Sequence, residues 1–506
     1  MKNIGYRSVL PYQVLLVSAI ILSQAGVFPA QTAAAQTGTP AMNAEVKALP
    51  VIPAPKSGKL TGGNMTLTPK SRIVITKADL RPLAKVLAAE IKQLVGLDLA
   101  INDGFFTRAG DIALKIDAAM KDESYAVEVG KAAVVKAGNP AAVAQGSVTL
   151  LQSLASRGGA VTLPHMSVQD APAVGYRGLL IDCARQAHSI RTLQQMVILC
   201  RWYKVRYLQL HLTDDQAFCF PSTKFADKLK GSWKLEELKD LVKFADDRGV
   251  TIIPELDVPG HASAIVGALP EIFGAGGNVV AAGREETYKA LDTLVGEMCD
   301  VFRSTPYFHI GADEVNKGAW NNPETAAYMA TNKIENAEEL YRHFVVRMNE
   351  IVKKHGKKTL VWEGFGKGGK IAIPRDMTVL SYEIVFYLPN DLVNDGYKIV
   401  NATWTPLYVV NDNCRSPEEI YGWNLFQFKK FRAPAADQGL IIPPTNAVLG
   451  AQMCAWEQPE TRELPSLRQR LAAMSERIWN PDAGRTFADF TERLRATDMG
   501  LTQVLP

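Results

Sequence analysis

The stretch Tyr307-Phe-His-Ile-Gly-Ala-Asp-Glu-Val-Asn316 is an apolar run that ends in two adjacent carboxylates, Asp313 and Glu314. Gly311 and Ala312 are small, which lets the backbone turn and approach a ligand closely. Neighbouring side chains on an extended backbone point to opposite faces, so the two carboxylates are not expected to be a matched acid/base pair. We expect them to contact two different atoms of one substrate at the end of a buried strand.

The same arrangement recurs from about residue 170 to 495, where short apolar runs alternate with amphipathic helical patterns. Strands are expected at 178–183, 207–212, 251–256, 307–311, 359–364, 378–383, 398–403 and 448–455, and helices at 191–203, 234–248, 285–302, 337–354 and 466–479. Eight strands joined by crossover helices predict an α/β fold, the (β/α)8 TIM barrel. The alternative, a doubly wound open sheet, would need a Gly-rich phosphate loop after its first strand, which the sequence lacks.

Polar and aromatic side chains gather where these strands end. In a TIM barrel the active site lies at the carboxyl ends of the strands. The residues that chemistry alone would choose fall there: Asp182, Arg185, His211, Asp214, Asp215, Glu255, Asp257, His261, Asp313, Glu314, Trp362, Glu363, Tyr408, Trp456 and Glu457. This clustering supports the barrel and predicts one site at its rim.

Two segments precede the barrel. Residues 49–165 carry strand patterns at 72–76, 111–116, 125–129 and 133–136 and helix patterns at 80–96 and 140–156, which predict a small α/β domain. It holds few candidate catalytic groups, so we interpret it as structural. Before it, Lys2 and Arg7 lead into an apolar run at 14–22 and then small residues, which is typical of a signal peptide over 1–35.

Residues 36–48 are small and polar and are expected to be a linker. The alternative for the N-terminus, a membrane anchor, is disfavoured because the apolar run is short and Ser18 interrupts it. We therefore expect export to the periplasm or the outside, with no membrane association. The formal net charge is +4 with charges interspersed, and no basic block indicates nucleic acid. None of the six cysteines forms a close metal-ligand pair, and most are expected to be buried.

Several of the rim residues have a plain structural alternative. The Arg185 guanidinium can hold two neighbouring sugar hydroxyls or a carboxylate, or simply pair with Asp182. His261 follows a tight turn and could tune a nearby acid or hold the loop by a hydrogen bond. For Asp215 we favour a surface charge over a functional role.

A catalytic metal has to be considered because His, Asp and Glu share this rim. Metal-dependent barrel hydrolases usually carry two histidines as His-x-His, whereas the run here is Gln209-Leu210-His211. We expect no metal and no other cofactor. Trp362, Trp404, Tyr408 and Trp456 near strand ends suit the apolar faces of sugar rings, and core packing is the alternative for each.

The motifs of the chain resemble the β-N-acetylhexosaminidases of glycoside hydrolase family 20. The resemblance rests on 176–185, 207–216, 254–261, the His309-Ile-Gly-Ala-Asp-Glu-Val315 run with Ala312 where Gly is usual, and 471–479. Residues 49–53 and the strand at Tyr125 are similar to the small domain that precedes this barrel. The resemblance covers about 49–495 and implies an exo-acting hydrolase of N-acetylhexosamine-containing glycans.

The resemblance also implies a role for each site residue. Glu314 would be the general acid and then the base at the glycosidic oxygen, while Asp313 orients the 2-acetamido nitrogen and Tyr408 bonds its carbonyl. The other expected site residues are Asp214 and His261, which would support Glu314, Arg185, which would bind ring hydroxyls, Trp362 and Trp456 as walls, and Glu457 and His211 beside the substrate. In this family the substrate's own acetamido oxygen attacks the anomeric carbon.

The C-terminal half departs from the family pattern. Tyr382 or Glu383 stands where a Trp often ends strand six, Val410 replaces an Asp or Asn, and Gln458 replaces a Glu. These positions would read the outer hydroxyls, so the sugar identity stays open. Alternatives to the main interpretation are a glycosidase of the same mechanism on a different or modified 2-acetamido glycan, and a catalytically decayed glycan-binding protein.

Overall fold

The computed structural model describes residues 49–121, 123–434, 436–481 and 484–506. The predicted signal peptide (1–35) and linker (36–48) lie outside these residues and stay predictions. Within the described part of the chain, no helix combines the length and the apolar composition that a bilayer crossing requires.

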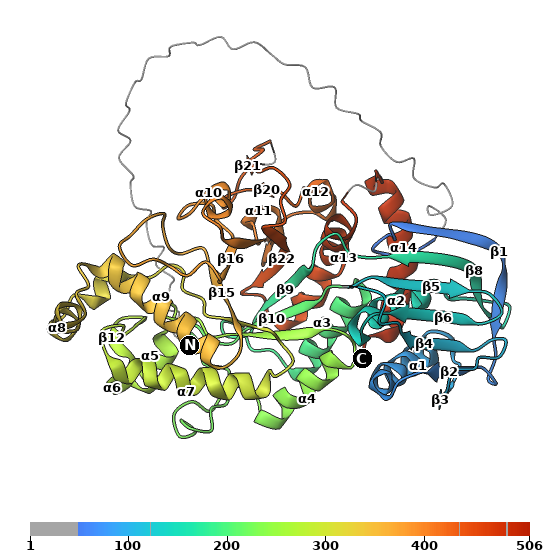
Figure 1. The fold of residues 1–506 in the computed structure, drawn as a ribbon, viewed down its shortest axis with the longest axis horizontal. Coiled ribbons are helices and arrows are strands. Elements are labelled where there is room, and N and C mark those ends of the chain that lie inside the picture. The colour runs from blue at the N-terminus through green and yellow to red at the C-terminus, as the bar shows by residue number, and fades with distance from the viewer. Residues whose placement is uncertain (1–48, 122, 435, 482–483) are drawn as a thin grey trace, which may run out of the picture. The chain divides into compact units, whose positions relative to one another are not determined.

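The first unit is one mixed sheet with two helices (Figure 1). Its strand order is β1-β8-β5-β6-β4-β2-β3, with β7 paired to β8. The elements are β1 Ser57–Leu67, β2 Arg72–Ile75, α1 Arg81–Val95, β3 Ala100–Asp103, β4 Ile112–Ile116, β5 Tyr125–Val129, β6 Ala133–Ala137, α2 Pro140–Gln152, β7 Ala155–Arg157 and β8 Ala160–Asp170, with a 3-10 turn η2 at Ala78–Leu80. The last strand thus continues five residues beyond the bound of 165 expected from sequence.

The predicted helix at 140–156 was too long. Helix α2 ends at Gln152, and residues 155–157 instead pair with β8. The hairpin turns through Gly158 and Gly159, whose φ angles of 57° and 79° suit glycine. Apolar residues continue past the helix end, so the pattern alone did not show the break.

The second unit is a closed barrel of eight parallel strands, which confirms the predicted (β/α)8 fold. The strands are β9 Tyr176–Asp182, β10 Tyr207–His211, β11 Thr251–Glu255, β14 Tyr307–His309, β15 Lys358–Trp362, β16 Thr378–Ser381, β17 Lys398–Asn401 and β22 Val448–Trp456. Each pairs in parallel with the next, and β22 pairs with both β17 and β9. That double pairing closes the ring.

Long helices follow most of the strands and surround the barrel (Figure 1). They are α3 Ile190–Trp202, α4 Leu235–Asp246, α7 Glu285–Val301, α9 Ala337–Lys354 and α13 Glu460–Trp479. The shorter or additional elements are α5 Ser263–Ala268, α6 Pro270–Phe273, β12 Gly274–Gly276, β13 Val279–Val280, η3 Lys317–Trp320, α8 Pro323–Asn332, α10 Pro389–Asn394, α11 Trp404–Leu407, β18 Tyr408–Val410, β19 Asn413–Cys414, α12 Pro417–Gly422, β20 Gln427–Phe428, β21 Leu440–Ile441 and α14 Phe487–Val504.

Helix α13 begins at Glu460 rather than at the predicted 466. Pro465 lies inside it, five residues after its first residue, where the missing N–H costs one hydrogen bond without ending the helix.

The barrel interior is filled with side chains, because alternate residues of each strand point inward. Tyr176, Leu180, Ile253, Leu360 and Val400 pack there into one buried cluster. The opposite faces of the strands pack against the helices in the larger core. The six cysteines are free, and five of them are buried; Cys414 is partly buried. The packed interior leaves the carboxyl rim of the barrel as the place for a site.

Candidate active site

The two adjacent carboxylates sit on a tight turn after β14. Gly311, Ala312 and Glu314 have φ angles of 67°, 76° and 50°, so three of four successive residues are left-handed. A Cβ atom at Gly311 would lie 1.7 Å from Oδ1 of Asp257, so only glycine fits there. The Ala312 N–H donates to that same Oδ1 at 3.2 Å, and the Tyr341 hydroxyl donates to the Ala312 carbonyl at 2.6 Å. The turn is therefore held from both sides.

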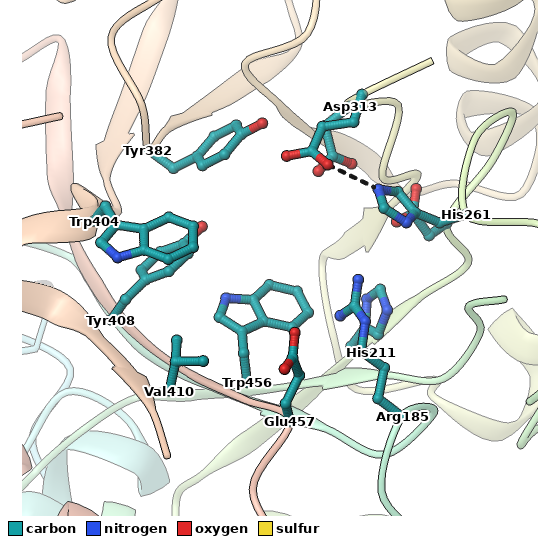
Figure 2. Close-up of a pocket in the computed structure, with 12 residues that line it drawn as sticks. Arg185, His211, His261, Asp313, Tyr382, Trp404, Tyr408, Val410, Trp456 and Glu457 are labelled. Carbon is teal, nitrogen blue, oxygen red and sulfur yellow. Dashed lines mark ion pairs between the residues drawn. The ribbon is translucent and has the colours of Figure 1, made fainter. Parts of the chain in front are cut away.

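A cavity opens directly above this turn, and Figure 2 shows the side chains that surround it. It is lined by Arg185, His211, Asp257, His261, Asp313, Glu314, Tyr382, Trp404, Tyr408, Val410, Trp456 and Glu457. Eight of the ten residues expected from sequence are among them. The other two, Asp214 and Trp362, are not part of this lining and act from behind it.

One chain of charged groups runs from Asp214 through His261 to Glu314. Nδ1 of His261 lies 3.6 Å from Oδ1 of Asp214, and Nε2 lies 3.6 Å from Oε2 of Glu314. Burial alone would lower the pKa of His261, but the two carboxylates outweigh it and raise that pKa to about 12. The His261 imidazolium in turn lowers the pKa of Glu314, whose side chain is 51% exposed to the cavity. Without substrate, the proton of this pair resides on His261.

Asp214 is also tied to Arg185 and His211. Nε2 of His211 lies 2.8 Å from Oδ2 of Asp214, and a guanidinium nitrogen of Arg185 lies 2.8 Å from the same oxygen. Burial would raise the pKa of Asp214, but hydrogen bonds from His211 and His261 outweigh it and lower that pKa. Arg185 also donates to Asp182 at 3.1 Å, so the ion pair weighed in the sequence analysis exists while Arg185 still faces the cavity.

Asp313 differs from its neighbour in environment. Burial, opposed by the charge of His261 and reinforced by Glu314 and Glu255, raises the pKa of Asp313 to about 6. Its Oδ1 is buried and has no hydrogen-bond partner among the described residues. An unpaired buried carboxylate oxygen beside a cavity is suited to accept a hydrogen bond from a bound ligand.

Beneath the cavity, Glu255 joins several strands. It lies 3.0 Å from Nδ1 of His211 and 3.2 Å from Nδ1 of His309, and it accepts hydrogen bonds from Gln209 at 2.8 Å and from the Trp362 indole at 2.7 Å. Burial would raise the pKa of Glu255, but the histidines hold it well below its usual range. The expected wall residue Trp362 is thus a buried support below the floor, where its ring packs against His309 at 4.8 Å.

Aromatic rings build the other side of the cavity. Tyr382 and Tyr408 are nearly parallel at 6.3 Å between ring centroids, and Trp404 packs against Tyr408 at 4.4 Å. Trp456 lies under the Arg185 guanidinium at 5.2 Å. Three residues of this side of the cavity were not assigned to the site from the sequence: Tyr382, Trp404 and the apolar Val410. The sequence did point to Trp404, because it is one of the aromatic residues near the strand ends. Tyr382 and Val410 were noticed only as departures from the family pattern.

Asp257 was among the rim residues chosen from the sequence, but it was given no role in the site. It lines the cavity, and burial together with the nearby charge of Asp313 raises its pKa well above the usual range. In the sequence, Asp257 stands at the start of the turn that ends at His261.

Two rim carboxylates serve as structural anchors. Glu363 is buried and accepts hydrogen bonds from the Ser381 hydroxyl and from the N–H groups of residues 384, 385 and 386. Asp215 accepts from the backbone and hydroxyl of Ser263 at 3.0 and 2.8 Å, so it holds the loop that carries His261 and is not simply a surface charge.

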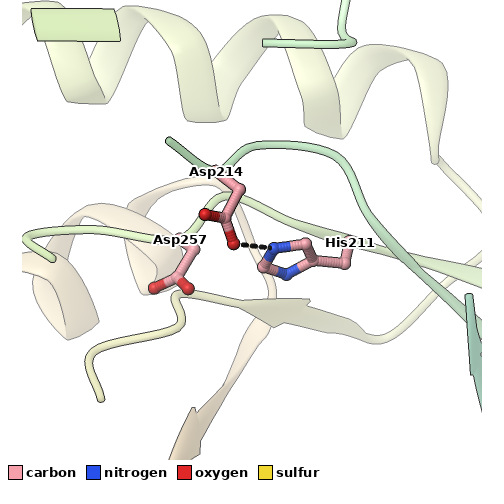
Figure 3. Close-up of side chains that lie close together, drawn as sticks. All are labelled: His211, Asp214 and Asp257. Carbon is pink, nitrogen blue, oxygen red and sulfur yellow. Dashed lines mark hydrogen bonds and ion pairs between the residues drawn. The ribbon is translucent and has the colours of Figure 1, made fainter. Parts of the chain in front are cut away.

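Clusters of His and Asp at this rim could geometrically hold a metal ion, and Figure 3 shows the most buried of them, His211, Asp214 and Asp257. In this cluster both ring nitrogens of His211 face carboxylates, and burial is outweighed by Glu255 and Asp214 so that the pKa of His211 is raised well above its usual value. A metal ligand has to be a neutral imidazole. The histidine and the Arg185 guanidinium therefore already supply positive charge where a cation would bind.

Comparisons with known proteins agree with this geometry. A family model described as the catalytic domain of glycosyl hydrolase family 20 matches residues 175–482, and one for domain 2 of the same family matches residues 48–171. Together they span the two units of the structure.

Individual relatives are more distant. A β-hexosaminidase of Porphyromonas gingivalis is 27% identical over 500 residues, which cover 88% of this chain and 62% of that protein. A β-N-acetylhexosaminidase of Cellulomonas fimi is 26% identical and covers 88% of this chain and 92% of the relative. The chain thus spans about three fifths of the first relative's length. An exo β-N-acetylglucosaminidase structure from Vibrio harveyi has the same fold, with a TM-score of 0.78, 23% identity, and coverage of 90% of this chain and 77% of that one.

Proposed function

The chain belongs to glycosyl hydrolase family 20, and from that premise we propose that it is an exo-acting, retaining β-N-acetylhexosaminidase. Its substrates would be glycans with a terminal 2-acetamido-2-deoxy sugar. The observation that carries the proposal is the pairing of two adjacent carboxylates in different environments. Glu314 is half exposed beside a cationic histidine, and Asp313 is partly buried with a free acceptor oxygen. Such a pair can serve two different atoms of one substrate.

In the first step the acetamido carbonyl oxygen attacks the anomeric carbon and the bond to the leaving oxygen breaks. Glu314 donates a proton to that oxygen, so the leaving group departs neutral. Nε2 of His261 lies 3.6 Å from Oε2 of Glu314. A bound sugar removes water from Glu314 and raises its pKa, which favours transfer of the proton from His261 to the acid.

Asp313 and Tyr408 would hold the acetamido group during this attack. The free oxygen of Asp313 accepts the acetamido N–H, and its negative charge stabilises the positive charge that develops on the five-membered ring. The Tyr408 hydroxyl donates to the carbonyl. In the second step water attacks the anomeric carbon, Glu314 takes its proton, and the acetamido group is released with retention of configuration.

The remaining lining residues would bind the sugar. Arg185 presents donors for ring hydroxyls, and Trp456 and Tyr408 present flat apolar faces.

We also propose that the protein is exported, on the strength of the N-terminal sequence, and that neither a metal nor another cofactor takes part. Prolonged dialysis against a chelator should then leave the rate unchanged, and a rate restored only by a divalent cation would contradict that part of the proposal.

The test is an assay on a chromogenic N-acetylhexosaminide. Wild type should hydrolyse it, and Glu314→Gln should lose most of the rate on a natural disaccharide, by roughly 10²–10⁴-fold. The loss on an aryl glycoside with a good leaving group should be much smaller. Glu350→Gln, on the exposed face of α9, is the matched control. Binding of the sugar without any turnover by wild type would show a decayed, glycan-binding site instead.

A further inference from the structure

Tyr382 follows β16 directly and lines the cavity with its phenol. The side chain is buried, and its hydroxyl has no hydrogen-bond partner among the described residues. Figure 2 shows this hydroxyl on the side of Asp313. A buried hydroxyl without a partner costs free energy, so such a group is suited to contact the reacting groups at some stage of the reaction. The mechanism proposed above leaves this hydroxyl without a function.

The ring of Tyr382 is held by its neighbours. It packs edge-on against the Trp362 indole at 5.7 Å, and it lies nearly parallel to the Tyr408 ring at 6.3 Å between centroids. The Tyr382 carbonyl accepts a hydrogen bond from the Trp404 N–H at 2.9 Å. Because ring and backbone are both fixed, only rotation of the O–H bond decides which acceptor the phenol meets.

The groups around this hydroxyl are mostly acceptors. Burial raises the pKa of the Tyr382 phenol well above its usual value, and the charges of Asp313 and Glu314 raise that pKa further. Tyr408 and Glu383 act in the same direction. The phenol therefore keeps its proton throughout the working pH range and is a permanent hydrogen-bond donor.

The carboxyl group of Glu314 responds to this donor. His261 lowers the pKa of Glu314 most, and Arg185 and the Tyr382 hydroxyl lower that pKa further. Glu314 stands on a left-handed turn with its side chain 51% exposed, and its Oε2 lies 3.6 Å from Nε2 of His261. The histidine and the phenol thus act on the same carboxylate from two different strand ends.

The two donors differ in one respect. His261 can donate to Glu314 only while its Nε2 carries a proton, because its Nδ1 faces Asp214. Once that proton has passed through Glu314 to the leaving oxygen, Nε2 presents a lone pair to the Glu314 carboxylate. The negative charge on Glu314 then has no donor from the histidine. The Tyr382 hydroxyl can donate at every stage.

We propose that Tyr382 is a positioning residue for the acid and base of the reaction, and that its hydroxyl donates a hydrogen bond to the Glu314 carboxylate as the proton leaves for the glycosidic oxygen. The inference rests on the proposed function, since it concerns the same site. The bond stabilises the charge that develops on Glu314 in the first step. It also holds the carboxylate in place for the second step, in which Glu314 takes a proton from water. No proton passes to or from Tyr382.

The test is Tyr382→Phe, which removes the hydroxyl and keeps the ring between Trp362 and Tyr408. On a natural disaccharide, whose leaving oxygen needs a proton, kcat/KM should fall roughly tenfold or more, the size expected for a hydrogen bond to a charged group. On an aryl glycoside with a good leaving group, kcat/KM should change by less than about twofold, because little proton transfer takes place. The basic limb of the kcat profile on the disaccharide should move to higher pH, since the phenol lowers the pKa of Glu314.

Tyr203→Phe is the matched control. The Tyr203 hydroxyl is also buried without a partner among the described residues, but Tyr203 follows α3 and is not part of the cavity lining. This variant should match wild type on both substrates and in the pH profile.

Two results would overturn this inference alone. Equal losses on the two substrates in Tyr382→Phe would show that the hydroxyl binds the sugar instead, and an unmoved basic limb would show that it does not act on Glu314. A wild type that hydrolyses neither substrate would overturn the proposed function and this inference with it.

Discussion

The two halves of the barrel rim consist of different kinds of side chain, charged in one half and mainly aromatic or apolar in the other. At the ends of β9 to β14, carboxylates, histidines and Arg185 form one linked network in which most charges have fixed partners. At the ends of β15 to β22, rings pack on rings, and Val410 faces the cavity without a polar contact. A proton-transfer site needs defined protonation states, which only a fixed charge network supplies. A sugar-binding wall needs only shape, so it can change with the substrate.

The sharpest way to break this comparison is to add one methyl group to each half. Gly311→Ala places a Cβ 1.7 Å from Asp257 at a φ of 67°. We expect a loss of roughly 3 kcal/mol or more in the free energy of unfolding and no measurable activity, because neither the backbone nor Asp257 can yield without opening the network. Thermal unfolding and the glycoside assay measure both effects.

The matched change in the other half is Gly366→Ala. Its Cβ would meet only the Phe386 carbonyl at 3.7 Å, an ordinary contact, and its φ is not positive. Its unfolding midpoint and rate should stay close to wild type. Equal damage from the two substitutions would show that the halves do not differ in rigidity.

Asp313→Asn tests the charge in the first half. Asp313 has to be ionised to stabilise the developing positive charge, and its pKa is raised to about 6. The rate should therefore rise with pH through about 6 in wild type. The asparagine variant should be slower by roughly 10²-fold and should lack this acidic limb, since an amide does not titrate there. A variant that keeps the limb would assign it to another group.

His261→Ala tests the link to the acid. The His261 imidazolium lowers the pKa of Glu314, so its removal should raise that pKa. The limb on which Glu314 loses its proton should move to higher pH while the maximum rate falls. A kcat/KM profile against pH, with His165→Ala in the small domain as control, measures the shift. A lower rate with an unmoved profile would indicate damage to the loop and not loss of the charge.

Among the substitutions of residues that line the cavity, Val410→Ala should have the smallest effect. It removes two methyl groups from the apolar wall, and contacts of this size are worth about tenfold in discrimination. We expect the loss on an unsubstituted sugar to stay within that range and to appear mainly in KM. A large drop in kcat would show that Val410 takes part in the reaction itself, and the division of the rim into a catalytic half and a binding half would then be wrong.

Much of the fold was predictable because the strands are short apolar runs with turns on both sides. The ends of the strands were harder to predict. Strand β14 ends at His309, two residues before the predicted end at 311, because the backbone already turns at Gly311. Tyr408 was placed at the end of the seventh strand, but β17 ends at Asn401, and Tyr408 begins the separate strand β18 after the turn of α11. Only the pairing of β18 with β22, a long-range contact, puts it at the rim.

The candidate site was predictable where charge marks it. Asp313, Glu314, His261 and Arg185 stand out in the sequence and meet at one cavity. From the sequence, Trp362 was expected to be a wall of the cavity. Its burial below the floor follows from its hydrogen bond to Glu255, which the sequence does not show. The contact of Phe431 with Trp404 is a further long-range packing that the sequence does not show.

The central claim is that the substrate's acetamido oxygen is the nucleophile. The most direct measurement is the rate on a series of aryl glycosides whose N-acetyl group carries zero, one, two or three fluorine atoms. Fluorine withdraws electrons from the carbonyl oxygen, so a nucleophilic role predicts a steep fall in kcat/KM with each substitution while the leaving group stays the same. A flat series, with the trifluoro compound hydrolysed as fast as the parent, would contradict the account.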